Sequence, residues 1–223
     1  MNEIIINVGI IDDDSTKRTQ LISALSKGVS DASEDVISQY EDYILNPIEL
    51  NIRENIEDVL YELIEKKINV LLADYQLSSY EPVDYNGVDL ADLTDNKYLN
   101  FPIFLLTSYE ADLYRHETFD AYKVFDYERY MTEPKERIEL NKKIIEQYEK
   151  RKRDIANKQR ELLHLQETND GSPKTNDRIF ELDDYLERSL DGENAISKLE
   201  KKRLFDDKFE EMMNLLHQVL KEE

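Results

Sequence analysis

The chain has 223 residues, which is enough for one moderate domain with an extension or for two small domains. It has no cysteine and no apolar run long enough to span a bilayer, which excludes disulfide scaffolds, thiolate zinc sites and membrane-spanning helices. Its net charge of −21 excludes a general electrostatic attraction to nucleic acid or to anionic lipid. The N-terminus lacks the basic start of a signal peptide, so we expect a soluble, cytoplasmic protein.

The composition changes near Pro134. Residues 1–134 carry 10 basic and 28 acidic side chains, whereas residues 135–223 carry 19 basic and 22 acidic ones. Before Pro134, strand-like and helix-like segments alternate, and after it the chain is helix-like almost throughout. This change predicts an α/β domain over residues 1–134 and an α-helical partner-binding region over residues 135–223.

The first domain contains short runs of Ile, Val and Leu, which predict buried parallel strands. We expect strands over residues 4–11, 36–44, 70–74 and 102–107, and a last one within residues 122–131. Between them we expect a helix over residues 15–27 capped by Ser15 or Thr16, a turn at Asn46-Pro47, a loop over residues 78–87, and helices over residues 52–67, 88–96 and 111–121. The alternation predicts a doubly wound, parallel, five-stranded sheet.

The second region is dominated by charged helical sequence. Residues 135–168 contain no Gly or Pro and predict one long helix, followed by a turn over residues 169–175 and a second helix over residues 177–190. A third helix is predicted over residues 194–221, with apolar residues at 4-3-4-3 spacing: Phe205, Phe209, Met212, Leu216 and Val219. Such a seam needs another helix, either inside the chain or on a partner, so we expect a helical hairpin, bundle or coiled coil that can also form a homodimer.

Chemically reactive side chains stand where three of the predicted strands end. Asp12 and Asp13 follow the first strand, Asp74 ends the strand over residues 70–74, and Thr107 ends the strand over residues 102–107. Ligands of open α/β sheets bind beyond the carboxyl ends of the strands. If these strands are neighbours, the site suits a hard divalent cation such as Mg²⁺ and a phosphoryl group, because carboxylates bind such cations and can form acyl phosphates.

This arrangement resembles the receiver domain of two-component response regulators, a flavodoxin-like fold. Asp12-Asp13 resembles the acidic pair of that family, Asp74 its phosphoacceptor, and Thr107-Ser108 its Thr/Ser-small pair. The segment Asn86-Gly87-Val88-Asp89-Leu90 resembles the glycine-containing turn into its third helix.

The resemblance implies a function and a set of site residues. A histidine kinase or a phosphotransfer protein would pass a phosphoryl group to Asp74, and Thr107 would hydrogen-bond that group. Mg²⁺ would be held by Asp13, by Asp12 through water, by the Asp74 carboxylate and by the backbone carbonyl of Gln76. An aromatic residue of the last strand, Tyr130 or Tyr127, would act as the switch.

The sequence departs from the family pattern at the last strand. The family ends this strand with Lys-Pro, whereas the best match here is Glu133-Pro134. An additional anion beside a phosphoaspartate opposes its formation. Lys123 or Arg129 could supply the missing cation from a shifted register. Alternatively, the domain is a pseudo-receiver, fixed in one state, that serves as a constitutive adaptor.

Three further motifs have competing interpretations. Asp12-x-Asp14-x-Thr16 also fits the nucleophile motif of haloacid-dehalogenase-like phosphatases, although the lysine and acidic pair that such enzymes need downstream are absent. His164, in the long helix, fits a surface histidine better than a phosphorelay donor. The basic cluster over residues 150–153 is flanked by acids and fits a solvated helix face.

The sequence therefore predicts a response-regulator-like signalling protein and not an enzyme, beyond phosphorylation of its own aspartate. Its helical region would contact a protein partner or a second copy.

Overall fold

The computed structural model describes residues 3–108, 123–190, 203 and 208. The chain divides into two compact units, of which the first is Met1–Asn96 with Asn100–Lys152 and the second is Lys97–Leu99 with Arg153–Glu223. Among the described residues, we find no helix with the length and apolar character needed to cross a membrane.

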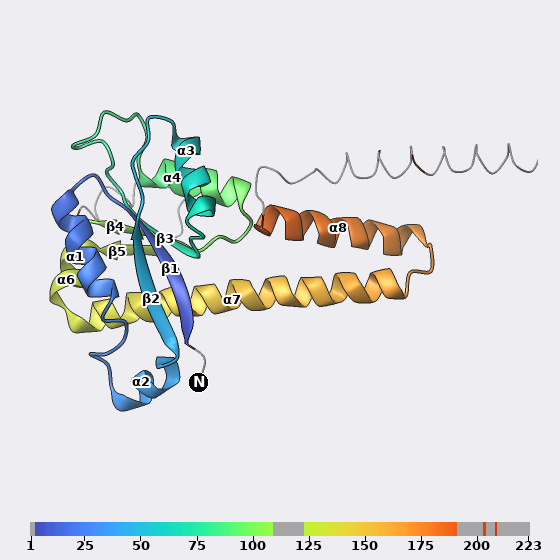
Figure 1. The fold of residues 1–223 in the computed structure, drawn as a ribbon, viewed down its shortest axis with the longest axis horizontal. Helices are drawn as coiled ribbons and strands as arrows, with labels where there is room; N and C mark the ends of the chain where they lie inside the picture. The colour runs from blue at the N-terminus through green and yellow to red at the C-terminus, as the bar shows by residue number, and fades with distance from the viewer. Residues whose placement is uncertain (1–2, 109–122, 191–202, 204–207, 209–223) are drawn as a thin grey trace, which may run out of the picture. The chain divides into compact units, whose positions relative to one another are not determined.

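A parallel sheet of five strands forms the centre of the first unit (Figure 1). Its strands are β1 (Ile4–Ile11), β2 (Tyr43–Glu49), β3 (Val70–Asp74), β4 (Ile103–Thr107) and β5 (Val124–Asp126). They are arranged in the order β2-β1-β3-β4-β5, and every pair is parallel. This is the flavodoxin-like order, so the predicted doubly wound, flavodoxin-like fold is confirmed.

The helices between the strands largely follow the predicted pattern. They are α1 (Ser15–Leu25), α2 (Glu34–Tyr40), α3 (Ile56–Glu65), α4 (Gly87–Lys97) and α6 (Tyr127–Thr132). The cap of α1 is Asp14 and not Ser15 or Thr16, because the Asp14 carboxylate accepts hydrogen bonds from the backbone N–H groups of Thr16 and Lys17. The helix predicted over residues 111–121 lies outside the described residues.

The second strand was predicted in the wrong place. Residues 34–40 form α2, and β2 begins only at Tyr43 and runs through Asn46-Pro47, where a turn was predicted. Proline is tolerated because β2 is an edge strand, so its missing N–H can face away from the ladder that β2 forms with β1. The sequence alone cannot reveal where β2 lies, because the position of a strand at the edge is a property of the whole sheet.

The core on one face of the sheet extends beyond Pro134. Helix α7 (Pro134–Glu167) begins directly after that residue, and its side chains Leu140, Ile144 and Ile145 are buried together with Ile6 and Val8 of β1. The first part of α7 therefore completes the α/β unit. The division of the chain into two compact units falls within α7, between Lys152 and Arg153.

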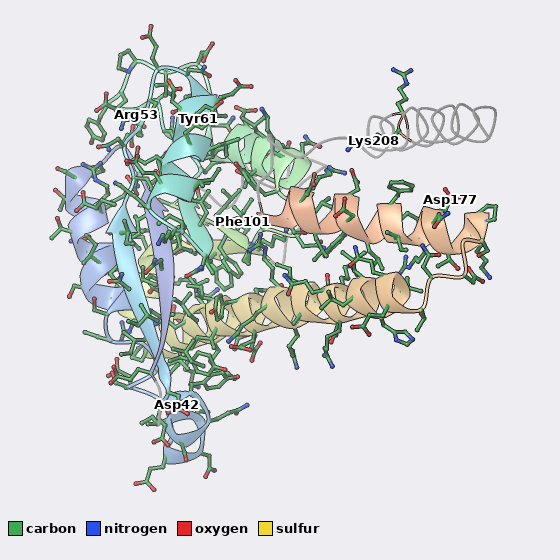
Figure 2. All side chains as sticks on the ribbon, turned by 45° about the vertical axis from the view of Figure 1, so that its right-hand side comes forward. Asp42, Arg53, Tyr61, Phe101, Asp177 and Lys208 are labelled. Carbon is green, nitrogen blue, oxygen red and sulfur yellow. The ribbon has the colours of Figure 1, made fainter. Side chains whose placement is uncertain are left out.

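A buried carboxylate of α3 holds the loop that precedes this helix. Glu62 is almost fully buried and forms ion pairs with Arg53, at 3.2 Å, and Lys66, at 2.6 Å. Its Oε1 also accepts a hydrogen bond from the side-chain amide of Asn51. Arg53 lies in the loop at the start of α3, and Tyr61 projects from that helix with 56% of its surface exposed (Figure 2).

In the second unit, the later part of α7 and helix α8 (Pro173–Leu190) form an antiparallel hairpin. Arg178 pairs with Glu161 at 2.7 Å, and Tyr185 donates a hydrogen bond to Asp154, so residues later in α8 meet residues earlier in α7. The predicted helical hairpin is confirmed. The third helix predicted over residues 194–221, with its apolar seam, lies outside the described residues.

Candidate functional site

Three carboxylates meet at the carboxyl ends of β1 and β3. One oxygen each of Asp12, Asp13 and Asp74 lies within 4.8 Å of the others, and the three residues are only 2%, 8% and 7% exposed. They come together because β1 and β3 are parallel neighbours, with Ile11 in register with Ala73. The fold thus brings together in one crevice the acidic residues that the sequence places at the strand ends.

Backbone amides hold two of these carboxylates in place. Asp12 Oδ1 accepts a hydrogen bond from the N–H of Asp14 at 2.8 Å, and Asp13 Oδ2 accepts one from the N–H of Tyr80 at 2.7 Å. Tyr80 belongs to the long loop between β3 and α4, so this loop reaches the crevice. Gln76 lies in the first part of the same loop, two residues after Asp74, with its side chain exposed.

The crevice is electrostatically unfavourable for three charged acids. Burial, reinforced by the charge of Asp74, raises the pKa of Asp12 from 3.8 to about 7. Burial also raises the pKa of Asp74, although the neighbouring Lys17 ammonium partly offsets the effect. A bound cation would relieve this repulsion, and the donors are all carboxylate oxygens, which fit a hard divalent cation such as Mg²⁺.

Lys17 is a member of the site that the sequence did not predict. Its Nζ lies 3.6 Å from Asp74 Oδ2 and 5.2 Å from the centre of the Tyr127 ring. Burial lowers the pKa of Lys17, but the charges of Asp74 and Asp12 outweigh this effect and raise it overall. The available signal was the cap at Asp14, since it places Lys17 in the first turn of α1, where side chains lean towards the helix start.

Thr107 and Gly87 complete the surroundings of Asp74. Thr107 is the last residue of β4, the strand adjacent to β3, and is 1% exposed. A Cβ atom added to Gly87, the first residue of α4, would stand 2.2 Å from the backbone oxygen of Asp74. The glycine in the predicted turn is therefore required because α4 starts in contact with the end of β3.

The end of β5 differs from the prediction. The strand ends at Asp126, which is in register with Thr107, so Asp126 and not Glu133 occupies the strand end. The Asp126 carboxylate caps α6 by accepting a hydrogen bond from the N–H of Arg129. Glu133 lies exposed at the end of α6 and pairs with Arg129. The alignment of Glu133 with the end of the last strand was therefore wrong.

Two other predicted site residues are placed differently from their expected roles. Lys123 pairs with Asp95 of α4 at 3.8 Å, and the structure gives it no ion pair with Asp74. Tyr130 lies in α6 and not on a strand, is fully buried, and donates a hydrogen bond to Asn141 Oδ1 at 3.0 Å. Tyr127 lies beside Lys17, whose Nζ is 5.2 Å from the centre of its ring, whereas Tyr130 is packed in the core.

Comparisons with known proteins give no family by sequence. No family model and no curated protein matches the chain. Among solved structures, the chain is similar to a two-component transcriptional regulator from Clostridium phytofermentans (17% identity, TM-score 0.44, covering 65% of this chain and 96% of that one). It is also similar to the anti-anti-sigma factor PhyR from Bartonella quintana (15% identity, TM-score 0.42, covering 70% of this chain and 51% of that one). The fold assignment rests on the strand order of the sheet.

Proposed function

We propose that this protein is a response-regulator-like signalling protein in which Asp74 accepts a phosphoryl group with the help of Mg²⁺. The observation that carries the proposal is the cluster of three buried carboxylates within 4.8 Å at the ends of two neighbouring parallel strands. A buried, like-charged cluster is unfavourable without a cation, so its presence favours a site for metal and phosphate over a structural role.

The chemistry assigned to the site is one phosphoryl transfer. A carboxylate oxygen of Asp74 attacks the phosphorus of a phosphohistidine or of a small acyl phosphate, and a new P–O bond forms. The P–N or P–O bond to the donor breaks, and the leaving group keeps the electron pair. A histidine leaving group takes up a proton from the solvent, whereas a carboxylate leaving group stays ionised. Mg²⁺, when bound, screens the repulsion between two anions. Asp12 and Asp13 would hold the metal with Asp74, and the Thr107 hydroxyl would donate a hydrogen bond to a phosphoryl oxygen.

The partners follow from this chemistry. A histidine kinase or a phosphotransfer protein would supply the phosphoryl group, and the helical region from α7 onward would contact a protein partner or a second copy. Helix α7 runs without a break from the α/β unit into the second unit. The backbone carbonyl of Gln76 would be a further ligand of Mg²⁺.

A pseudo-receiver is the second candidate function. It is favoured by Asp126 at the end of β5, where the family has a lysine. The phosphatase interpretation is weaker, because the Asp14 carboxylate that would act as general acid is engaged in capping α1.

Beryllofluoride titration in the presence of Mg²⁺ separates these functions, because beryllofluoride forms a phosphoryl-like adduct with an aspartate. We expect saturable shifts in the NMR spectrum and a raised melting temperature for the wild type, no response for Asp74→Ala, and a wild-type response for Asp92→Ala, which removes an exposed acid of α4. An unresponsive wild type, or an equal response in Asp74→Ala, would refute the proposal. Turnover of a chromogenic phosphate ester that Asp12→Asn abolishes and Asp74→Asn does not would support the phosphatase instead.

A further inference from the structure

We propose that Lys17 of α1 supplies the cation for a phosphoryl group on Asp74, a role that the end of β5 cannot fill in this protein. The inference rests on the phosphoryl acceptance proposed above and assigns one further positioning residue to it. The ammonium group would pair with a non-bridging phosphoryl oxygen, and no proton would be transferred.

The start of α1 directs Lys17 to the crevice. The cap at Asp14 fixes the first turn of the helix immediately after the acidic pair. From this turn, Lys17 Nζ reaches to 3.6 Å from Asp74 Oδ2. A phosphoryl group on Asp74 would be bonded to a carboxylate oxygen of this residue, so the group would form where the ammonium already lies.

The position of the ammonium is fixed by more than one contact. The side chain of Lys17 is 26% exposed, and Nζ lies 5.2 Å from the centre of the Tyr127 ring, within the range of a cation–π interaction. The adjacent Arg18 diverges from it, since its Nε pairs with Glu49 of β2 at 3.4 Å. Lys17 thus points to the carboxylates of the crevice, whereas Arg18 contacts the edge strand β2.

The other basic side chains considered for this role have different partners. Lys123 pairs with Asp95, and Arg129 pairs with Glu133 and Glu136. The residue in register with Thr107 at the end of β5 is Asp126, an acid. The fold therefore has an anion at the strand end where the family has a cation, and a cation on α1 next to the predicted phosphoacceptor.

This placement gives Lys17 two opposite effects. Before phosphorylation, the ammonium competes with Mg²⁺ for the Asp74 carboxylate, so removing it should strengthen metal binding. After phosphorylation, the same ammonium offsets the added negative charge, so removing it should weaken binding of a phosphoryl group. A residue that only supports the fold would change both affinities in the same direction.

The test uses the full chain with three substitutions: Lys17→Met, Lys17→Arg, and Lys27→Met as a charge control in the exposed turn after α1. Mg²⁺ affinity is measured by NMR titration, and beryllofluoride affinity and the rate of phosphorylation by acetyl phosphate are measured at saturating Mg²⁺. For Lys17→Met we expect Mg²⁺ affinity to rise several-fold and beryllofluoride affinity and phosphorylation rate to fall on the order of 10-fold or more, the range of a lost charged hydrogen bond. Lys17→Arg should retain most of both, and Lys27→Met should match the wild type.

Unchanged beryllofluoride affinity in Lys17→Met would overturn the inference, as would a parallel loss of both affinities or a larger loss in Lys123→Met. These results differ from a failure of the proposed function itself, in which the wild type binds no beryllofluoride and accepts no phosphoryl group.

Discussion

The charge of Asp12 should make the metal-free protein less stable as the pH rises, and Asp12→Asn should remove this dependence. Asparagine has nearly the same shape and keeps a side-chain oxygen for the N–H of Asp14, which donates to Asp12 Oδ1 at 2.8 Å. The substitution therefore removes a charge from the crevice and leaves the local hydrogen bond in place.

The magnitude follows from the pKa of Asp12. Burial and the charge of Asp74 raise it from 3.8 to about 7 in the folded protein. At 1.36 kcal/mol for each pKa unit, this lowers the free energy of unfolding by up to about 4 kcal/mol at pH values above 7. The folded state holds the proton of Asp12 more tightly than the unfolded state does. The stabilisation from this proton is therefore fully present below about pH 4 and is lost as the pH rises to about 7.

Urea denaturation in EDTA, followed by circular dichroism, measures this difference. At about pH 8 we expect Asp12→Asn to exceed the wild type by about 2–4 kcal/mol in its free energy of unfolding, and the difference to shrink to under about 1 kcal/mol near pH 4. Mg²⁺ at 100 times its dissociation constant should shrink this difference at about pH 8, because it stabilises the wild type by about 2.7 kcal/mol and the variant lacks one ligand.

Equal stability of the two proteins at both pH values, or a difference that grows as the pH falls, would refute the reasoning. It would mean that Asp12 is solvated or that the three carboxylates do not lie together in the metal-free protein.

Three other variants test the surroundings of the site and the core by urea denaturation near neutral pH. Gly87→Ala should destabilise the protein by about 1–3 kcal/mol, because its Cβ would stand 2.2 Å from the Asp74 backbone oxygen; wild-type stability would contradict this contact. Burial opposes ionisation of Glu62, but its lysine and arginine partners lower its pKa overall, so Glu62→Gln should lower the free energy of unfolding by about 2 kcal/mol. The wild type should lose this stabilisation as the pH falls below about 4.5, and the variant should not. An identical loss of stability at acid pH in both proteins would contradict the pairing. Asn141→Leu should cost about 1–3 kcal/mol because it leaves the buried Tyr130 hydroxyl without the acceptor seen at 3.0 Å, and Tyr130→Phe in the same background should restore part of the loss; simple addition of the two losses would argue against the bond.

Most of the fold could be predicted because its signals are local. The β3 and β4 strands contain continuous apolar runs, and β1 is apolar except for Asn7 and Gly9. The α7 helix is a long segment without Gly or Pro after its first residue, Pro134. The β2 strand was missed because its sequence includes Asn46-Pro47, which indicates a turn in isolation. Only the position of β2 at the edge of the sheet makes a proline acceptable there.

The extent of the core shows the same limit. The composition changes at Pro134, and a helix does begin there. Composition cannot show that Leu140, Ile144 and Ile145 are buried with the strands, because their apolar spacing fits a helix seam of any origin. The division of the chain within α7 is a property of packing.

The sequence alone determined the acidic site, because Asp12, Asp13 and Asp74 stand at the ends of recognisable parallel strands, and the geometry of such sheets brings those ends together. The tertiary structure decided which cation accompanies them. The start of α1 brings Lys17 within 3.6 Å of Asp74, whereas the register of β4 and β5 puts Asp126 level with Thr107. Residue spacing does not predict the Lys17–Asp74 contact or the register of Asp126 with Thr107, because both depend on where a helix begins and a strand ends in three dimensions.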